Sequence, residues 1–155
     1  MFYPGTDTNP YTGIFNPAFE DAYDRLTGNE TCCKFFGPGA VDTLQRARWS
    51  FQALGRPIKL ANGGYSSVGA STFPEGLGAV FINSQGPFIN PTHTLVLAPG
   101  RPFVDLSGGM SDVDARALII LHELGHLTGM FGPDTGKFAY YNKFFTGLVR
   151  TNCFQ

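Results

Sequence analysis

The first third of the chain combines turn-forming residues with apolar residues at helical spacing. Residues 18–26 predict a short helix, with Asn16 as its N-cap and Pro17 at its first position, where the N–H that proline lacks would have no partner. Residues 40–54 predict a longer helix, because their apolar positions recur three and four residues apart. Trp49 lies in this second segment, and an aromatic residue at helical spacing is more typical of a core than of a substrate contact.

From Pro57 onward, the pattern changes to short apolar runs separated by glycine, proline and asparagine. Short apolar runs between turn-forming residues are typical of strands. The repeated prolines restrict where these strands can pair continuously, because proline donates no backbone hydrogen bond. The pattern predicts strands of one small sheet, at residues 58–61, 70–73, 79–83, 94–98 and 103–106.

A third pattern predicts a buried helix over residues 112–127. Ser111 stands where an N-cap is needed, and Asp114, three residues later, places negative charge at the positive end of the helix dipole. The middle of this segment is apolar nearly all round, as in a helix that is buried on most sides. Residues 142–149 also have a helical pattern, which we interpret as structural.

Composition places these elements in one globular domain. The chain has 155 residues, of which 43% are hydrophobic, enough to bury a core without metal or disulfide support. Glycine (20), proline (11) and phenylalanine (15) are abundant and charged residues are few (15%), which predicts a loop-rich body with modest helix content. We interpret residues 1–155 as a single domain, which can be an excised part of a longer chain.

Charge and hydropathy disfavour two classes of partner. The formal net charge is −1 and the basic residues are scattered, so no positively charged surface is expected for nucleic acid or an anionic membrane. No run approaches the roughly 18 apolar residues that a membrane span needs. The first residues also lack the basic-then-apolar pattern of a signal peptide. We therefore expect neither nucleic acid nor a membrane as a partner.

The three cysteines are Cys32, Cys33 and Cys153. A bridge from Cys153 to one of the other two would tie the two ends of the chain together. It would indicate an oxidising compartment: extracellular, at the cell surface or in the periplasm. The odd count also allows three free thiols, and adjacent cysteines rarely bridge each other because the geometry is strained. A zinc site built on cysteine is disfavoured, because the sequence has no CxxC pair.

The residues that indicate chemistry form one motif, His122-Glu123-Leu-Gly-His126. On a helix, this spacing places both imidazoles on one face, one turn apart, where both can bind a single metal ion. Glu123 then lies beside them, in position to take a proton from a water. Shuffling the chain would produce HExxH in about one sequence in a thousand, so chance is a poor explanation. The remaining alternative is that these residues only pack or cap a helix.

Catalytic zinc needs a third protein ligand, with water in the fourth position. Gly129 is expected to end the helix and Gly132-Pro133 to turn the chain, which brings Asp134 back towards the metal. Aspartate is an accepted zinc ligand, but Asp134 could instead cap the turn that follows it. The weaker candidate is His93, which lies in a loop without ligand spacing and has the pattern of a polar surface group.

The segment His122-Glu123-Leu-Gly-His126-Leu-Thr-Gly129 resembles the extended HExxHxxG motif of the metzincin clan of zinc peptidases. In that clan the third ligand lies three residues after the glycine, where this chain has Gly132, so Asp134 is offset. The methionine turn of the clan is missing, because Met130 precedes Asp134 and no methionine follows. The chain thus resembles a divergent zincin. It is similar to small bacterial secreted domains, some of which use aspartate as the third ligand and some of which are joined to repeat-containing surface proteins.

This resemblance implies a fold and a class of substrate. The fold would be α+β: a zincin-like single domain with a small mixed sheet, a central HExxH helix and one or two further helices. An edge strand beside that helix would bind an extended peptide or protein substrate by strand addition, and residues 79–83 are the candidate. The pattern predicts neither a side-chain preference nor an oligomeric state.

The predicted activity is that of a zinc-dependent peptidase, a hydrolase with one catalytic Zn²⁺. Zinc on His122, His126 and Asp134 would activate a water, and Glu123 would act as the general base. Such a base then protonates the leaving amine, so one carboxylate serves both proton transfers.

Two alternatives stay open. Tyr140 or Tyr141 could stabilise the oxyanion, although tyrosine among phenylalanines is more simply a packing residue. The whole domain could also be a catalytically inactive zinc-binding structural or interaction domain of a larger surface or toxin-like protein. Glu123 separates the two functions, because a purely structural metal site has no need of a base beside the metal.

Overall fold

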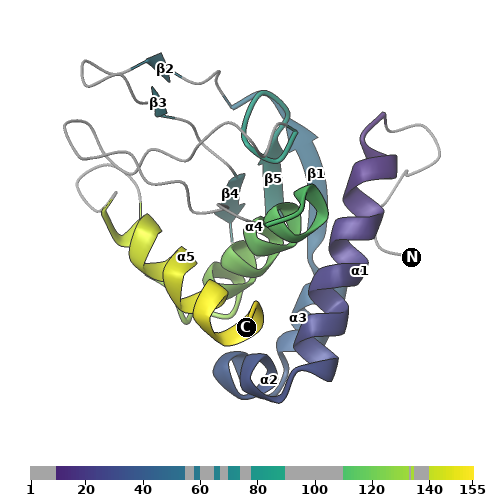
Figure 1. The fold of residues 1–155 in the computed structure, drawn as a ribbon. Helices are drawn as coiled ribbons and strands as arrows, with labels where there is room; N and C mark the ends of the chain where they lie inside the picture. Colours follow the sequence, from purple (N-terminus) through teal and green to yellow (C-terminus); the bar gives the residue numbers. More distant parts are fainter. Residues whose placement is uncertain are drawn as a thin grey trace.

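A computed structural model describes residues 10–54, 58–59, 65–66, 70–73, 78–89, 110–132, 134 and 140–155, and the fold is given for these residues. Helices surround a small sheet, which confirms the α+β class (Figure 1). The described elements are α1 (Thr12–Gly28), α2 (Glu30–Phe36), α3 (Ala40–Arg46), β1 (Arg48–Gln52), β2 (Ile58–Lys59), β3 (Tyr65–Ser66), β4 (Ala70–Phe73), β5 (Ala79–Asn83), α4 (Asp112–Leu127) and α5 (Tyr140–Cys153). The expectation of one or two further helices was too low, because four accompany the HExxH helix α4 in this part of the chain.

The main sheet is mixed, as expected, with the strand order β1-β5-β4. β5 pairs in parallel with β1, where Trp49 lies opposite Val80, and antiparallel with β4, where Thr72 lies opposite Val80. The prediction that residues 79–83 form an edge strand is therefore wrong. Four of the five residues of β5 are buried, as expected for a strand with a neighbour on each side. A separate antiparallel pair joins β2 and β3.

The first helix is longer than predicted. α1 begins at Thr12, so Asn16 and Pro17 lie inside it and do not form its N-terminus. Pro17 is tolerated there because the carbonyl that loses its partner belongs to Gly13, an exposed residue in the first turn, where water can replace the missing N–H. The added turns bury Phe15 completely, which favours their formation.

The predicted helix over residues 40–54 is wrong in its second half. α3 ends at Arg46, and Ala47 is extended (φ −60°, ψ 147°). The chain then forms β1, which pairs with β5. The backbone hydrogen bonds to β5 replace those that a continued helix would make. Trp49 is a core residue, as expected, but it lies on a strand, and its Nε1–H donates to the carbonyl of Leu44 at 3.2 Å.

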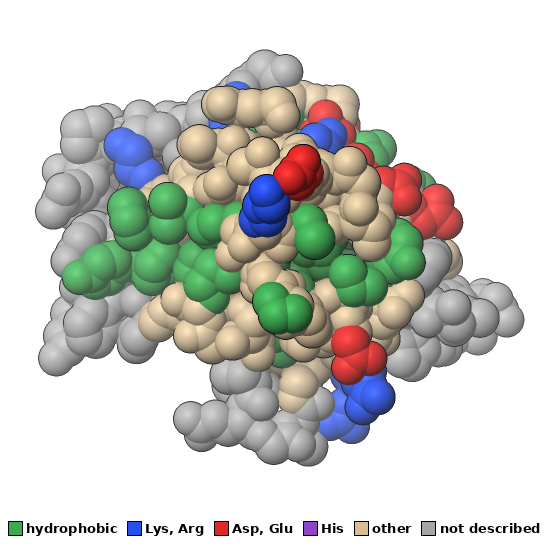
Figure 2. Space-filling view, turned by 90° about the horizontal axis from the view of Figure 1, so that it is seen from below, with side chains coloured by type: hydrophobic (Ala, Val, Ile, Leu, Met, Phe, Trp, Pro, Cys, Tyr) green, Lys and Arg blue, Asp and Glu red, His purple; other side chains and the backbone are tan. Residues whose placement is uncertain are grey.

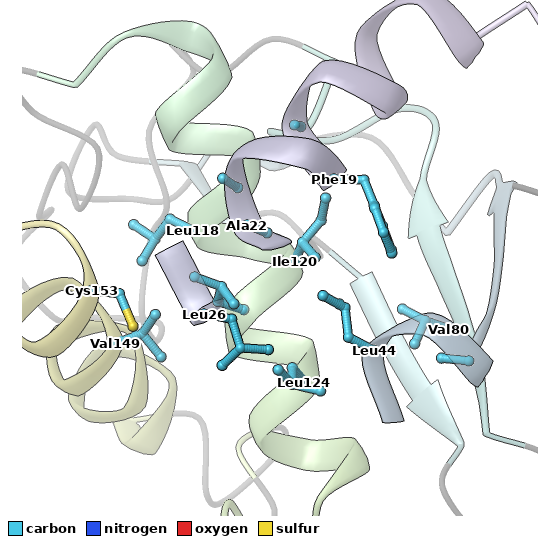
Figure 3. Packing of buried hydrophobic residues seen from close by; sticks show 14 of the residues in the cluster. Phe19, Ala22, Leu26, Leu44, Val80, Leu118, Ile120, Leu124, Val149 and Cys153 are labelled. Carbon is cyan, nitrogen blue, oxygen red and sulfur yellow. The ribbon is translucent and has the colours of Figure 1, made fainter. Parts of the chain in front are cut away.

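α4 is the central helix of the molecule. In Figure 1 it lies between α1 and α5, and it packs against both of them as well as against α3 and β4. Figure 3 shows side chains from α1, α3, β5 and α5 converging on it. The prediction of a helix that is buried on most sides is confirmed; its fully or nearly fully buried apolar residues include Ala117, Leu118, Ile120, Leu121 and Leu124.

Two links fasten the C-terminal helix. A disulfide joins Cys32 in α2 to Cys153 at the end of α5, and Cys33 is a free, exposed thiol. Of the alternatives that the sequence left open, the bridge between the ends of the chain is the one that forms, and Cys32 is its second cysteine. Arg25 of α1 donates to the carbonyl of Cys153 at 2.9 Å and to Asp114 Oδ1 at 3.0 Å. The C-terminus of α5 is thereby connected to α1, α2 and the first turn of α4.

Other expectations concern the surface and the remaining strands. The strands predicted at 94–98 and 103–106 lie outside the described residues. No described helix is both long and apolar enough to cross a membrane. On the face drawn in Figure 2, hydrophobic side chains form a band among a few charged ones, and none of the described histidines is visible.

Candidate metal centre

The two motif histidines are positioned by α4. Ser111 Oγ accepts a hydrogen bond from the N–H of Asp114 at 3.1 Å, so the helix begins at the predicted cap and has the predicted bounds. His122 and Glu123 are each only 5% exposed. Polar groups buried to this extent need partners, and those of His122 lie on the segments that follow the helix.

The chain turns back at Gly129, just after α4, where the sequence predicts the helix to end. This glycine has φ 77°, in the left-handed region that glycine enters without steric penalty. Its N–H donates to the carbonyl of His126 at 3.0 Å, and the N–H of Phe131 donates to the carbonyl of Gly125 at 3.0 Å. These bonds fold the segment back along the histidine-bearing face of α4 and bring Asp134 to it.

Three ligand-type atoms converge at this point. Oδ2 of Asp134 lies 2.7 Å from Nε2 of His122 and 2.9 Å from Nε2 of His126. The two Nε2 atoms are 3.2 Å apart. The structure thus brings together all three residues that the sequence proposed as metal ligands.

A second carboxylate lies close to the same histidines. His122, Glu123 and His126 offer ligand atoms within 4.8 Å of one another, a spacing at which Glu123 could also hold a metal. Its Oε2 is 3.8 Å from Nε2 of His122, whereas Oδ2 of Asp134 is at hydrogen-bonding distance from both histidines. Asp134 therefore lies closer to His122 than Glu123 does, with Glu123 beside the contact between Asp134 and the histidines.

Helix α5 contacts this group from the other side. Thr146 Oγ1 is 2.9 Å from Nδ1 of His122, the ring nitrogen that faces away from Asp134. Asn142 donates from Nδ2 to Oδ2 of Asp134 at 3.4 Å. Sequence reasoning missed both residues, although they are four positions apart in a helix whose buried residues Val149 and Cys153 continue the same stripe.

The electrostatics of the site favour a positive charge at its centre. Burial alone would raise the pKa of Asp134, but hydrogen bonds from His122 and His126 outweigh it and hold this pKa well below its ordinary value. Burial would likewise lower the pKa of His126, but the bond to Asp134 and the charges of Glu123 and Asp134 raise it. Carboxylates that attract a proton to the His126 imidazole would equally attract a metal cation.

Aromatic rings enclose the histidines. The rings of Phe131 and Phe145 are stacked, with centroids 4.4 Å apart, and the Phe131 centroid lies 5.7 Å from that of His122 and 5.8 Å from that of His126. Tyr141 stacks on Phe145 at 5.7 Å, which agrees with the packing interpretation of this tyrosine. The Tyr140 side chain and His93 lie outside the described part of the structure.

Comparisons of the chain with protein-family models, with curated proteins and with solved structures each found no match.

Proposed function

We propose that the protein is a zinc-dependent peptidase with a zincin-like fold. In this proposal His122, His126 and Asp134 hold the zinc ion and Glu123 is the general base. The observation that carries it is the convergence of two imidazole nitrogens and one carboxylate oxygen within 2.7–3.2 Å of one another.

The spacing of these atoms fits zinc. With bonds of about 2.0–2.1 Å and tetrahedral angles, neighbouring ligand atoms should be about 3.3 Å apart. The three observed distances are 3.2, 2.9 and 2.7 Å, slightly contracted from that value. Two histidines and a carboxylate, with a fourth position left for water, are also a donor set found at catalytic zinc.

Hydrogen bonds alone cannot account for all three contacts among the Nε2 atoms of His122 and His126 and Oδ2 of Asp134. Each Nε2 carries at most one hydrogen, so two nitrogens cannot supply a hydrogen bond along all three edges. If both donate to Asp134, two N–H groups face each other across 3.2 Å. A central cation would instead accept a lone pair from every corner, which supports a metal as the natural occupant.

Glu123 supplies the proton chemistry in this proposal. When bound, zinc polarises the scissile carbonyl and lowers the pKa of water. Glu123 takes a proton from the attacking water and passes it to the departing amine nitrogen. Its burial, together with a position 3.8 Å from the nearer imidazole, supports this role rather than that of a solvated surface carboxylate.

The substrate in this proposal is an extended peptide or protein segment. Because β5 is the middle strand, strand addition falls instead to β4, an outer strand of the described sheet that packs against α4. The Cys32–Cys153 disulfide supports an oxidising, extracellular or cell-surface environment for this activity.

Metal content and peptide cleavage, measured on the same samples, test the proposal. Wild type should purify with, or take up, one zinc per chain and cleave members of a peptide library. Glu123→Gln should keep the zinc and lose about 10²–10⁴-fold in cleavage rate, the usual contribution of a general acid–base. Asp134→Ala should lose zinc, whereas Asp24→Ala, at an exposed position in α1, should behave as wild type.

Unchanged zinc affinity in Asp134→Ala would remove this residue from the ligand set. Zinc binding by wild type without cleavage of any library member would favour the alternative function, a zinc-binding structural or interaction domain.

A further inference from the structure

Thr146 is a buried polar residue that faces the metal-ligand set from outside. It is 4% exposed, and its hydroxyl lies 2.9 Å from Nδ1 of His122, which is itself 5% exposed. The hydroxyl is thus on the opposite side of the imidazole ring from the Nε2 atom that meets Asp134.

The two ring nitrogens of a neutral histidine are linked in their protonation. One carries the hydrogen and the other carries a lone pair, and a metal needs the lone pair. A hydroxyl oxygen that accepts from Nδ1–H therefore selects the tautomer in which Nε2 is free to bind metal. It also fixes the rotation of the ring about its bond to the chain.

We propose that Thr146 is a positioning residue, whose hydroxyl oxygen accepts a hydrogen bond from Nδ1–H of His122 and so directs the Nε2 lone pair to the metal centre. The inference rests on the proposed function for its metal, but it does not require that the protein cleave peptides.

The placement of Thr146 follows from the packing of α5. Asn142, one turn earlier, reaches Asp134, so consecutive turns of one helix face support two different ligands. The same face continues through the buried Val149 to Cys153, where the disulfide to α2 fastens the helix. In this arrangement one face of α5 holds the side chains of His122 and Asp134 in position.

Two substitutions separate the hydroxyl from the shape of the side chain. Thr146→Val keeps the size and branching but removes the hydroxyl, whereas Thr146→Ser keeps the hydroxyl and removes a buried methyl group. If Thr146 acts through its hydroxyl, the valine variant should bind zinc about 10–100-fold more weakly and the serine variant should stay within about threefold of wild type. If it only packs, serine should be the more damaging change, because it leaves a cavity.

Zinc affinity is measured by competition with a chromophoric chelator, and thermal unfolding of the metal-free proteins shows whether each variant folds. Nitrogen-15 NMR of the zinc-loaded wild type adds a test that needs no variant. It should show His122 protonated at Nδ1 and bound to the metal through Nε2.

Three results would overturn the inference: valine binding zinc as tightly as wild type, serine binding as weakly as valine, or metal bound through Nδ1. If wild type binds zinc but cleaves no peptide, the peptidase proposal fails and the inference about Thr146 is still decided by its own variants. If wild type binds no zinc, both fail.

Discussion

The ring of Phe131 lies directly against Gly125, in the space that a β-carbon at residue 125 would occupy. The glycine inside the HExxH motif is therefore a packing requirement of this fold. Its missing side chain lets the returning segment approach α4 closely enough for Phe131 to pack beside both histidines.

Gly125→Ala should therefore displace Phe131 and destabilise the protein by about 1–3 kcal/mol, the usual range for overpacking a core. The matched control is Gly147→Ala, since a β-carbon there meets nothing within 4 Å and alanine favours the helix. Denaturant unfolding of both variants provides the measurement. Equal stability of the two would show that Phe131 moves aside at no energetic penalty.

The left-handed turn at Gly129 gives a second prediction. Alanine at φ 77° is strained, so Gly129→Ala should lower the free energy of unfolding by about 1 kcal/mol or more and weaken zinc binding by displacing Asp134. Gly132→Ala, at an exposed position without positive φ, is the control. Zinc titration and denaturant unfolding measure the two effects, and a Gly129→Ala protein that matched its control would contradict the role of this turn.

The disulfide should contribute to stability independently of the metal. Cys32 and Cys153 are 121 residues apart, and closing so long a loop restricts the unfolded chain, so replacing both with serine should lower the stability by roughly 2–5 kcal/mol. Cys33→Ser should leave the stability unchanged, because Cys33 is a free and exposed thiol. Thermal unfolding without added reductant compares the two. A large loss in Cys33→Ser would indicate that this thiol has a structural role.

A pair of carboxyl groups should make stability depend on pH. Burial and a hydrogen bond with Asp114 raise the pKa of Asp21 to about 6, although Arg25 opposes the shift. The folded protein then holds this proton more tightly than the unfolded chain. The stability that Asp21 contributes is therefore fully present below its ordinary pKa of 3.8 and is lost as the pH rises through about 6.

Asp21→Asn should remove that loss of stability between pH 4 and 6, measured by denaturant unfolding across this range. Asp114, whose pKa is lowered, acts in the opposite sense and only at more acid pH. Asp24→Asn, an exposed position on the same helix, should keep the pH dependence of wild type. Identical pH profiles for wild type and Asp21→Asn would contradict the assignment.

The elements that sequence predicted best are those with local signals. The cap at Ser111, the apolar periodicity and the glycine that ends α4 all lie within a few residues of the helix, and its bounds were predicted correctly. Residues 48–52 look helical by the same criteria. They form a strand because β5, about thirty positions later, pairs with them.

The residues of the candidate site also separate into those with a local sequence signal and those placed by tertiary packing. His122, Glu123 and His126 follow from spacing along one helix, and Asp134 follows from a turn next to it. Thr146 and Asn142 could not be assigned, because their roles depend on how α5 packs on α4, which no short-range pattern encodes. The middle position of β5 was missed for a similar reason, since strand order depends on partners distant in sequence.

The bond between Cys32 and Cys153 makes the chain between them a covalent ring. That ring contains both described sheets, α4 and all of α5. A single backbone cut anywhere within it would leave the two pieces attached. Such a nicked chain would migrate as one band without reductant and as two with it, so any measurement of backbone cleavage needs both conditions.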